Sequence, residues 1–236
     1  MKKISNSLSL IVPAYNEEEL IEETIKIYNN ELKRLFTKYE IIAVDDGSTD
    51  NTQKILKKLQ LSIKPLKIVK HKTNLGVGKA LIDGFAKAKM DYVLHNSADR
   101  AFDLKDLGKI KGELNNYDVI VFVRYDRSAN SPFRKLTSRT SLFLIKLFFR
   151  TPIKDYHFVQ LYKNNILSTV KLEAHDTFMP PELLIKLYNK GYKFNHVQAV
   201  FHKRTAGKSK YNNPIRYLIY LKELLIFWLK LKLWPK

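Results

Sequence analysis

Carboxylates follow two apolar runs near the start of the chain. The run at residues 8–12 leads into Pro13-Ala14-Tyr15-Asn16-Glu17, and a run at residues 40–44 leads into Asp45-Asp46-Gly47-Ser48-Thr49-Asp50. Apolar runs that end in polar, turn-forming clusters are typical of parallel strands that deliver their loops to one edge of a sheet. Acidic groups at such an edge suit the nucleoside and the metal of a phosphorylated ligand. The pattern indicates a nucleotide-sugar enzyme.

A glycine-rich turn follows the third apolar run. Asn74-Leu75-Gly76-Val77-Gly78 precedes a helical pattern. Here Gly76 can let the backbone approach a ligand, and Lys79 can meet a phosphate. A tight turn with a solvated Lys79 explains the same residues equally well. Asp50 is expected to cap the helix that follows it rather than to bind a ligand.

Strands and helices must alternate to bring these clusters together. The apolar patterns predict strands at residues 8–12, 40–44, 66–70, 92–95 and 118–123. They predict helices at 18–36 and 50–59, and a third helix that the turn at 74–78 opens and that runs to about residue 88. Such repeats imply an α/β fold with a mostly parallel sheet. Pro13 is expected to end the first strand. The second half is less regular, with helices predicted at 137–149, 181–190 and 214–234 and a strand at 193–201.

Composition narrows the possible chemistry. The chain has 236 residues and no cysteine, which excludes disulfides, zinc–thiolate sites and thiol nucleophiles and suits a reducing compartment. No secretory signal pattern stands at the N-terminus. The net charge is +19, and most of the excess lies in residues 101–236. That half is expected to face nucleic acid, an anionic membrane or a lipid phosphate, unless the charge is only general basicity.

The predicted C-terminal helix is strongly apolar but carries Lys222, Glu223 and Lys230. Charges near a bilayer centre cost about 3 kcal/mol each, which argues against a membrane span. An amphipathic helix that lies on the membrane surface fits better, with Trp228 and Trp234 as anchors. The alternative is an ordinary helix that packs on the domain core.

Four motifs occur in one order along the chain: those ending at Glu17, at Asp50 and at Ala80, and the strand that leads into Ala98-Asp99. In this order they resemble the family 2 inverting glycosyltransferases, which have a GT-A fold with a mixed, mostly parallel sheet flanked by helices. The segment Arg204-Thr205-Ala206-Gly207-Lys208-Ser209-Lys210 is similar to the Arg-x-x-Gly-x-Ser-Lys segment of dolichyl- and polyprenyl-phosphate hexose synthases. The resemblance covers about residues 8–210.

The resemblance implies a donor site for UDP- or GDP-hexose. Asp45 and Asp46 are then candidates for binding the base and ribose, rather than only forming a turn. The full set expected around the nucleotide sugar is Pro13, Tyr15, Glu17, Asp45, Asp46, Gly76, Lys79, Ala98 and Asp99.

The fourth motif departs from the family pattern. Where relatives carry Asp-x-Asp for a divalent cation, this chain has Ser97-Ala98-Asp99, and Ala101 replaces a glutamine found in the lipid-phosphate synthases. Asp99 is therefore the expected ligand for Mg²⁺ or Mn²⁺, with weak metal dependence. Arg100 is a candidate for neutralising part of the phosphate charge. The alternative is a non-catalytic homologue that acts as a membrane-associated partner.

The basic second half is expected to bind the acceptor phosphate, through Arg124, Arg139, Arg204, Ser209 and Lys210. Helices rich in Leu, Phe and Trp favour a lipid over nucleic acid. Asp155 and Glu182 match acidic positions of the family. Glu182 is a candidate base or merely a helix N-terminal charge. The predicted catalytic residues are Asp99, Arg124, Glu182 and Arg204.

The sequence thus predicts an inverting hexosyltransferase that acts on polyprenyl or dolichyl phosphate, peripheral at the cytoplasmic face of a membrane. Residues 1–212 are expected to form the transferase domain, with a nucleotide-sugar half at 1–125 and an acceptor half at 126–212. Residues 213–236 form the surface helix. Because a lipid phosphate is already anionic, it needs no base, whereas transfer to a glycan or lipid-linked sugar hydroxyl, the alternative reaction, does.

Overall fold

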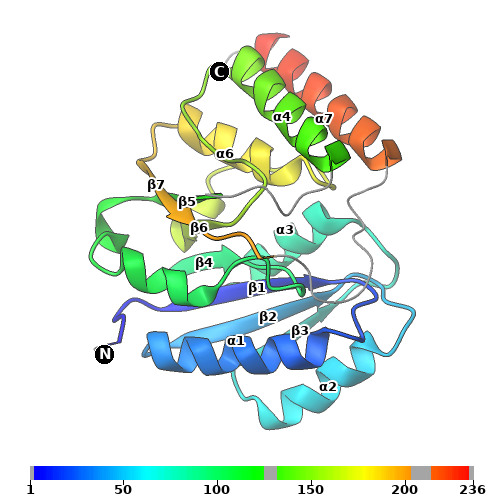
Figure 1. Cartoon of the computed structure of the whole chain (residues 1–236), viewed down its shortest axis with the longest axis vertical. Helices are drawn as coiled ribbons and strands as arrows, with labels where there is room; N and C mark the ends of the chain where they lie inside the picture. Colours follow the sequence, from blue (N-terminus) through cyan, green and yellow to red (C-terminus); the bar gives the residue numbers. More distant parts are fainter. Residues whose placement is uncertain (1–2, 125–131, 203–213, 234–236) are drawn as a thin grey trace.

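The computed structural model describes residues 3–124, 132–202 and 214–233. A seven-stranded sheet in the order β3-β2-β1-β4-β6-β5-β7 runs through the molecule (Figure 1). Its strands are β1 (Leu8–Ala14), β2 (Tyr39–Asp45), β3 (Leu66–Lys70), β4 (Tyr92–His95), β5 (Val119–Arg124), β6 (Gln160–Lys163) and β7 (Phe194–Ala199). The sheet is mixed because β6 runs antiparallel to both β4 and β5. The predicted mixed, mostly parallel sheet is confirmed.

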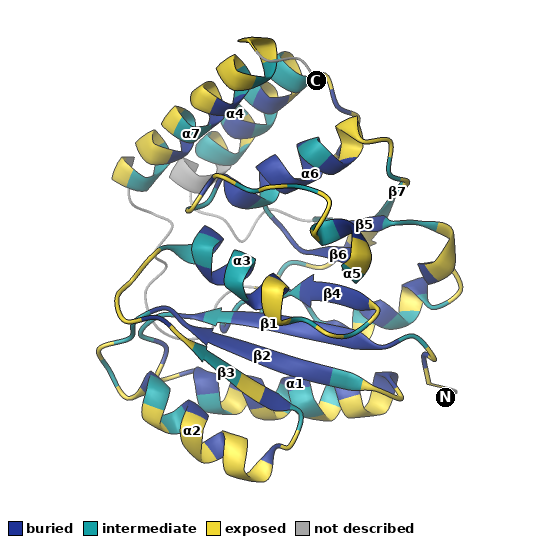
Figure 2. Ribbon diagram, turned by 180° about the vertical axis from the view of Figure 1, so that it is seen from behind, coloured by how far each residue is buried: buried dark blue, intermediate teal, exposed yellow. Residues whose placement is uncertain are grey.

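Helices cover both faces of the sheet, and each face has its own apolar core. One face carries α1 (Ile21–Leu35), α2 (Thr52–Ser62) and the short helix η1 (Leu104–Ile110). The other carries α3 (Val77–Lys87), α4 (Pro132–Phe149), α6 (Met179–Asn189) and α7 (Pro214–Leu233). Figure 2 shows the sheet as the buried layer between them. Two further short helices are η2 (Leu114–Asn116) and α5 (Asn164–Leu167).

Successive side chains of β1 are buried in the two different cores, because they point to opposite faces of the sheet. Leu10 and Val12 belong to the core under α1, whereas Ile11 belongs to the core under α3. This period of two is what a strand buried on both faces requires, and it explains why the run contains almost no polar residue.

The prediction that Pro13 ends the first strand is wrong. Pro13 lies opposite Val44 within β1, which continues to Ala14. The neighbouring strand β4 pairs with β1 only as far as Ile11 and His95. At Pro13 the strand therefore has a partner on one side alone, and a proline without an N–H is tolerated there.

Helix α7 packs against α4 and α6 rather than standing apart from the domain (Figure 1). Three residues of α7 itself are buried against the domain: Tyr220, Leu224 and Phe227. The rings of Phe148 and Trp228 stack with centroids 4.9 Å apart, so Trp228 binds α4 instead of standing free as an anchor. One side of α7 is thus core, as the alternative for this helix supposed, while its outer side remains exposed. Trp234 lies outside the described residues.

Candidate active site

The loops after β1 and β2 lock together at the carboxyl edge of the sheet. The Asn16 N–H donates to the Ser48 hydroxyl at 3.0 Å, and the Thr49 N–H donates to Asn16 Oδ1 at 2.8 Å. Asp50 accepts hydrogen bonds from the N–H groups of Thr52 and Glu18. Burial alone would raise the pKa of Asp50, but these bonds lower it overall. Asp50 therefore anchors the start of α2 within the protein, from the position before the N-cap residue Asn51 rather than as the cap itself.

Asp45 offers a buried acceptor at this edge. Its side chain is fully buried, and Oδ1 accepts the Ser48 N–H at 3.0 Å. Its other oxygen, Oδ2, has no hydrogen-bond partner among the described residues. A buried carboxylate oxygen without a partner is costly, and a donor from a ligand would relieve that cost. This supports the prediction that Asp45 contacts a base or ribose.

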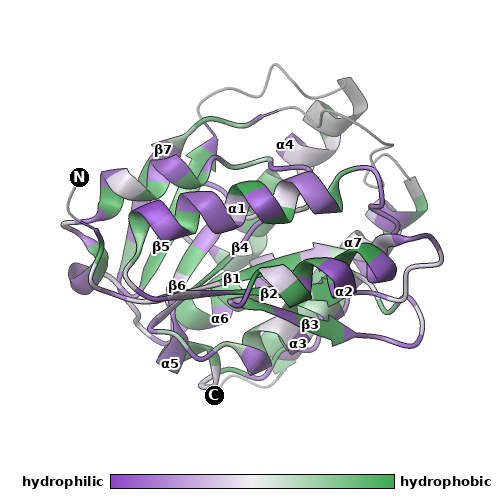
Figure 3. Cartoon of the chain, turned by 90° about the horizontal axis from the view of Figure 1, so that it is seen from below, coloured by the Kyte–Doolittle hydropathy of each residue, from purple (hydrophilic) through white to green (hydrophobic). Residues whose placement is uncertain are grey.

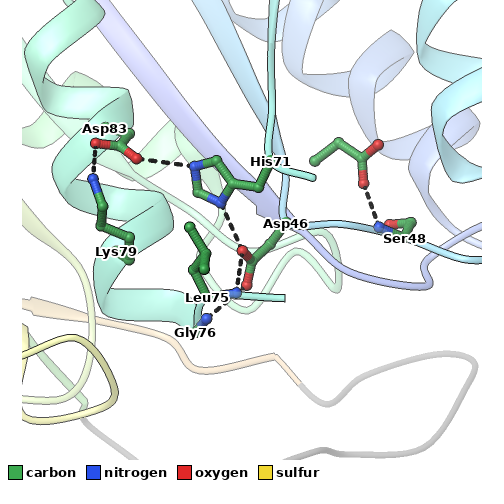
Figure 4. Close-up of polar contacts among 8 residues, drawn as sticks. Asp46, Ser48, His71, Leu75, Gly76, Lys79 and Asp83 are labelled. Atoms are coloured by element: carbon green, nitrogen blue, oxygen red, sulfur yellow. Dashed lines mark hydrogen bonds and ion pairs between the residues drawn. The ribbon is translucent and has the colours of Figure 1, made fainter. Parts of the chain in front are cut away.

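Asp46, predicted as the second nucleoside contact, is engaged within the protein (Figure 4). It accepts the N–H groups of Leu75 and Gly76 at 2.9 and 3.0 Å, and it lies 2.7 Å from His71 Nδ1. The other nitrogen of His71 lies 3.0 Å from Asp83. Asp46 thus fastens the loop that precedes α3 to the end of β2.

The same cluster occupies Lys79. Its ammonium group binds Asp83, one turn further along α3, instead of projecting alone toward a phosphate site (Figure 4). Gly76 has φ +94°, and a Cβ there would lie 2.8 Å from the His175 carbonyl oxygen. The glycine is therefore required by the packing of a protein loop, which is the turn interpretation rather than the ligand interpretation.

Asp99 lies in a loop that α1 holds in place. Tyr28 donates to the Ser97 carbonyl and Thr24 donates to the Ala98 carbonyl, both at 2.7 Å. The Ser97 hydroxyl binds the Asp99 carboxylate. Ala98 thus contributes backbone, and its side chain is buried. Within the described ranges no three His, Cys, Asp or Glu side chains form a metal cluster. A cation bound at Asp99 would take its other ligands from phosphate and water.

Arg100 is engaged by a residue of α1. It has φ +53°, and its guanidinium pairs with Glu23 on α1 at 3.1 Å. The contacts of Arg100 therefore do not support the prediction that it neutralises part of the phosphate charge.

Arg124 is held at the end of β5 by a bidentate pair. Its Nε and Nη2 lie 2.9 and 3.0 Å from the two oxygens of Asp155, and both side chains are buried. The guanidinium also lies over the rings of Phe158 and Phe201. A cation fixed in this way keeps one terminal nitrogen, Nη1, for a further acceptor.

Glu182, predicted as a candidate base, is occupied as well. Its carboxylate is buried, accepts the N–H groups of Glu173 and Ala174, and pairs with Lys186. It orders the loop before α6, which corresponds to the structural alternative. Arg139 is exposed on α4. Arg204, Ser209 and Lys210 lie outside the described residues.

A cavity of about 220 Å³ joins several of the predicted residues. Pro13, Asp99 and Arg124 line it, whereas Tyr15, Glu17, Asp45, Asp46 and Lys79 do not. Glu17 is buried beside α1. Lining residues that the sequence interpretation did not select for the site are His95, His157, Arg216, Tyr217 and Tyr220.

The signal for His95 was its place at the last position of β4, two residues before Ser97. The three α7 residues gave no such signal, because that helix was interpreted as a membrane-surface element or as an ordinary helix of the core, and not as part of a ligand site. Their placement in the cavity depends on the packing of α7 against the domain, which the sequence does not show.

Comparison with known proteins agrees with this geometry. The family described as Glycosyl transferase family 2 matches residues 9–168. The chain belongs to that family. The matched residues include β1, β2 and β4, whose ends carry the motifs on which the predicted resemblance was based.

Two similar relatives are undecaprenyl-phosphate 4-deoxy-4-formamido-L-arabinose transferases. The one from Pectobacterium carotovorum is 29% identical over 211 residues, 87% of this chain. The one from Proteus mirabilis is 29% identical over 216 residues, 88% of this chain. The chain spans 63% of the length of each relative.

Solved structures share the architecture. Glucosyl-3-phosphoglycerate synthase from Mycobacterium tuberculosis, in complex with Mn²⁺, UDP and glucosyl-3-phosphoglycerate, superposes with a TM-score of 0.69 at 18% identity, covering 94% of this chain and 80% of its own. Mannosyl-3-phosphoglycerate synthase from Rubrobacter xylanophilus gives 0.73 at 13% identity, covering 98% and 76%. The fold is therefore of the GT-A type, as predicted.

The two adjacent aspartates are expected to separate in their effects. Asp45→Asn should weaken binding of UDP or GDP, whichever binds, by tenfold or more with little change in melting temperature, because Oδ2 has no internal role. Asp46→Asn should lower the melting temperature by several degrees, because it disturbs a buried cluster with two backbone donors. Calorimetry and thermal unfolding measure the two effects. Equal losses of stability in both variants would contradict the assignment.

Proposed function

We propose that the protein transfers a hexose from UDP or GDP to polyprenyl or dolichyl phosphate, with inversion at the anomeric carbon. The observation that carries the proposal is the composition of the cavity. Asp99 is the single carboxylate among its described lining residues, and Arg124 is held on a buried partner in the same lining. The relatives named for undecaprenyl-phosphate support the lipid acceptor.

The chemistry of the acceptor explains why one carboxylate is enough. A sugar hydroxyl must lose a proton as it attacks, which needs a positioned base. A phosphate monoester has a second pKa of about 6 and attacks as an anion at neutral pH. Arg124 then orients the attacking phosphate through the nitrogen that Asp155 does not use. Glu182 is not required as a base, in agreement with its internal contacts.

The charge of the departing diphosphate must be stabilised at the opposite side of the sugar. Asp99 is the residue that would hold Mg²⁺ or Mn²⁺ there, and the cation would neutralise the developing negative charge. The related synthase structure contains Mn²⁺ together with UDP, which supports this placement. With a single carboxylate, the affinity for metal depends mainly on the diphosphate.

Metal binding should consequently require nucleotide. Titration of Mn²⁺ into the protein alone should give weak binding, and saturating UDP or GDP should strengthen it by tenfold or more, because the diphosphate supplies ligands. Asp99→Asn should abolish that gain. Undiminished transfer in excess chelator would remove the metal from the mechanism.

The acceptor assignment is tested at Arg204 and Lys210. Arg204→Ala and Lys210→Ala should each lower transfer to polyprenyl phosphate by tenfold or more, because charge-assisted hydrogen bonds to phosphate are lost. Binding of the nucleotide sugar should persist. Lys57→Ala, on the exposed side of α2, is the matched control.

The product of this reaction distinguishes the acceptor class. A phosphodiester-linked sugar is labile to mild acid, and mass spectrometry of the lipid fraction detects it. A stable glycoside would indicate transfer to a hydroxyl. Full activity of both the Arg204→Ala and the Lys210→Ala variant would disprove the proposed role of these two residues in binding the acceptor phosphate.

The outer side of α7 supports a membrane surface as the place of the reaction. The exposed apolar residues recur at three- and four-residue spacing, which places them on one face of the helix. They are Ile215, Leu218, Ile219, Leu225, Ile226, Leu229 and Leu233. Leu136, Phe143 and Leu147 of the adjacent α4 are exposed as well.

The charged residues of α7 differ in their contacts. Glu223 accepts the His175 N–H at 3.2 Å, and Lys230 pairs with Glu173, so both bind the protein. Lys222 is exposed among the apolar residues of the outer face. No helix in the described part of the chain is both long and apolar enough to cross a bilayer. We place the protein as peripheral, at the cytoplasmic face, with this outer face of α7 against the lipid.

Vesicle binding tests this surface. The protein should sediment with vesicles of phosphatidylcholine and phosphatidylglycerol, and less with phosphatidylcholine alone, because anionic lipid attracts the basic half. Leu218→Glu together with Leu229→Glu should reduce binding by tenfold or more. Leu61→Glu, at an exposed leucine of α2, should leave it unchanged. Equal binding by all three proteins would contradict the assignment.

A further inference from the structure

The cavity lies where the transferred sugar must be, if the proposed function holds. In a one-step inverting displacement the anomeric carbon stands between the leaving diphosphate and the attacking phosphate. Asp99 and Arg124, assigned to those two groups, both line this cavity. At about 220 Å³ it is smaller than a pocket for a drug-sized ligand, so it suits a single sugar ring rather than a whole nucleotide sugar.

Most polar groups in the lining already have partners. Ser97 binds Asp99, and Arg124 binds Asp155. The Tyr220 hydroxyl lies 3.3 Å from His157 Nε2. Ser141 donates to the carbonyl of the preceding turn of α4. These contacts shape the cavity but leave few groups to recognise a ligand.

Two buried polar atoms in the described lining have no hydrogen-bond partner: Nδ1 of His95 and the hydroxyl oxygen of Tyr217. His95 ends β4, and Tyr217 lies in the first turn of α7, so the two come from opposite halves of the chain. A buried polar atom without a partner costs free energy that a ligand group can restore. Both atoms therefore favour a polar ligand over an apolar one.

The protonation of His95 determines what its Nδ1 can do. The backbone of Phe158 favours a proton on the ring, and since Nδ1 has no hydrogen-bond partner we assign that proton to Nε2. Burial lowers the pKa of His95 to about 4, so the imidazole is neutral at physiological pH. Nδ1 is then an acceptor with no proton to donate. It suits a hydroxyl or N–H of the ligand and disfavours another acceptor.

We propose that His95 Nδ1 and the Tyr217 hydroxyl are the specificity-determining contacts for the transferred sugar, with His95 accepting a hydrogen bond from one of its hydroxyl or amide groups. The tyrosine hydroxyl both donates and accepts, and its partner is a second polar group of the ring. A site built to hydrogen-bond a substrate group rejects analogues that lack it. This inference rests on the proposed function and adds the residues that select the sugar.

Two isosteres separate the roles of the imidazole nitrogens. His95→Gln places an amide near Nε2 and keeps a donor for Phe158, but it removes the acceptor at Nδ1. His95→Asn places its carbonyl oxygen near Nδ1 and keeps the acceptor. Tyr217→Phe removes only the hydroxyl. Matched controls are His196→Gln on β7, a histidine outside the cavity whose Nε2 also has no partner among the described residues, and Tyr192→Phe.

The measurement is a ratio of affinities. Calorimetry compares the tightest-binding member of a UDP- and GDP-hexose panel with its nucleoside diphosphate, so the sugar's contribution is isolated and no lipid acceptor is needed. His95→Gln and Tyr217→Phe should each reduce that ratio by about tenfold, as expected for one hydrogen bond. Binding of the nucleoside diphosphate alone should stay unchanged. His95→Asn should keep most of the ratio, and both controls should keep all of it.

Several results would overturn the assignment. An unchanged ratio in His95→Gln and Tyr217→Phe would show that neither atom contacts the sugar. Equal loss for sugar nucleotide and free nucleotide would indicate a structural role, and melting temperatures of every variant check this directly. If the wild-type protein bound no nucleotide at all, the proposed function would fail and this assignment with it. Normal nucleotide binding without lipid transfer would contradict only the acceptor.

Discussion

The loops at the carboxyl edge of the sheet depend on one buried carboxylate, that of Asp46. Asp46 binds two backbone N–H groups of the loop before α3 and one nitrogen of His71, so the end of β2 and the start of α3 hold each other. Burying a charge is costly unless every oxygen is satisfied, and here both oxygens are. Asp46 makes these structural contacts, whereas Oδ2 of its neighbour Asp45 has no hydrogen-bond partner among the described residues and can accept one from a ligand. In our proposal the two adjacent aspartates thus have different roles, Asp46 in structure and Asp45 in ligand recognition.

Hydrogen bonds through His175 connect the start of α3 to the C-terminal helix α7. The Lys79 N–H donates to the His175 carbonyl at 3.0 Å, and the His175 N–H donates to Glu223 of α7 at 3.2 Å. Figure 3, which colours the ribbon by hydropathy, shows hydrophilic and hydrophobic residues alternating along the helices nearest the viewer, such as α1. Helix α7 is fixed to the domain by the His175–Glu223 hydrogen bond, so it can expose an apolar outer face while it remains packed on the domain.

The sequence predicted the first half of the fold well because local and global signals agree there. Strands β3 and β4 have the predicted bounds, since buried strands read as short apolar runs between turn residues. Strand β6 and helix α5 were missed. Each has four residues, and β6 exists through pairing with β4 and β5, which are distant in sequence. Contacts of that kind leave no local pattern to find.

The candidate site was predictable in composition but not in roles. Asp46, Lys79 and Glu182 have the residue types that bind ligands, yet each is satisfied by partners that only the folded chain supplies. His95 and Tyr217 belong to no motif. They line one cavity because α7 packs near the end of β4, and within the described residues each keeps a buried atom without a partner. In our proposal α7 contacts both the lipid and the sugar, which gives a physical reason for joining the two substrates. Its exposed apolar outer face would then bring the protein to the membrane that holds a lipid phosphate, and its inner face lines the cavity in which that phosphate would react.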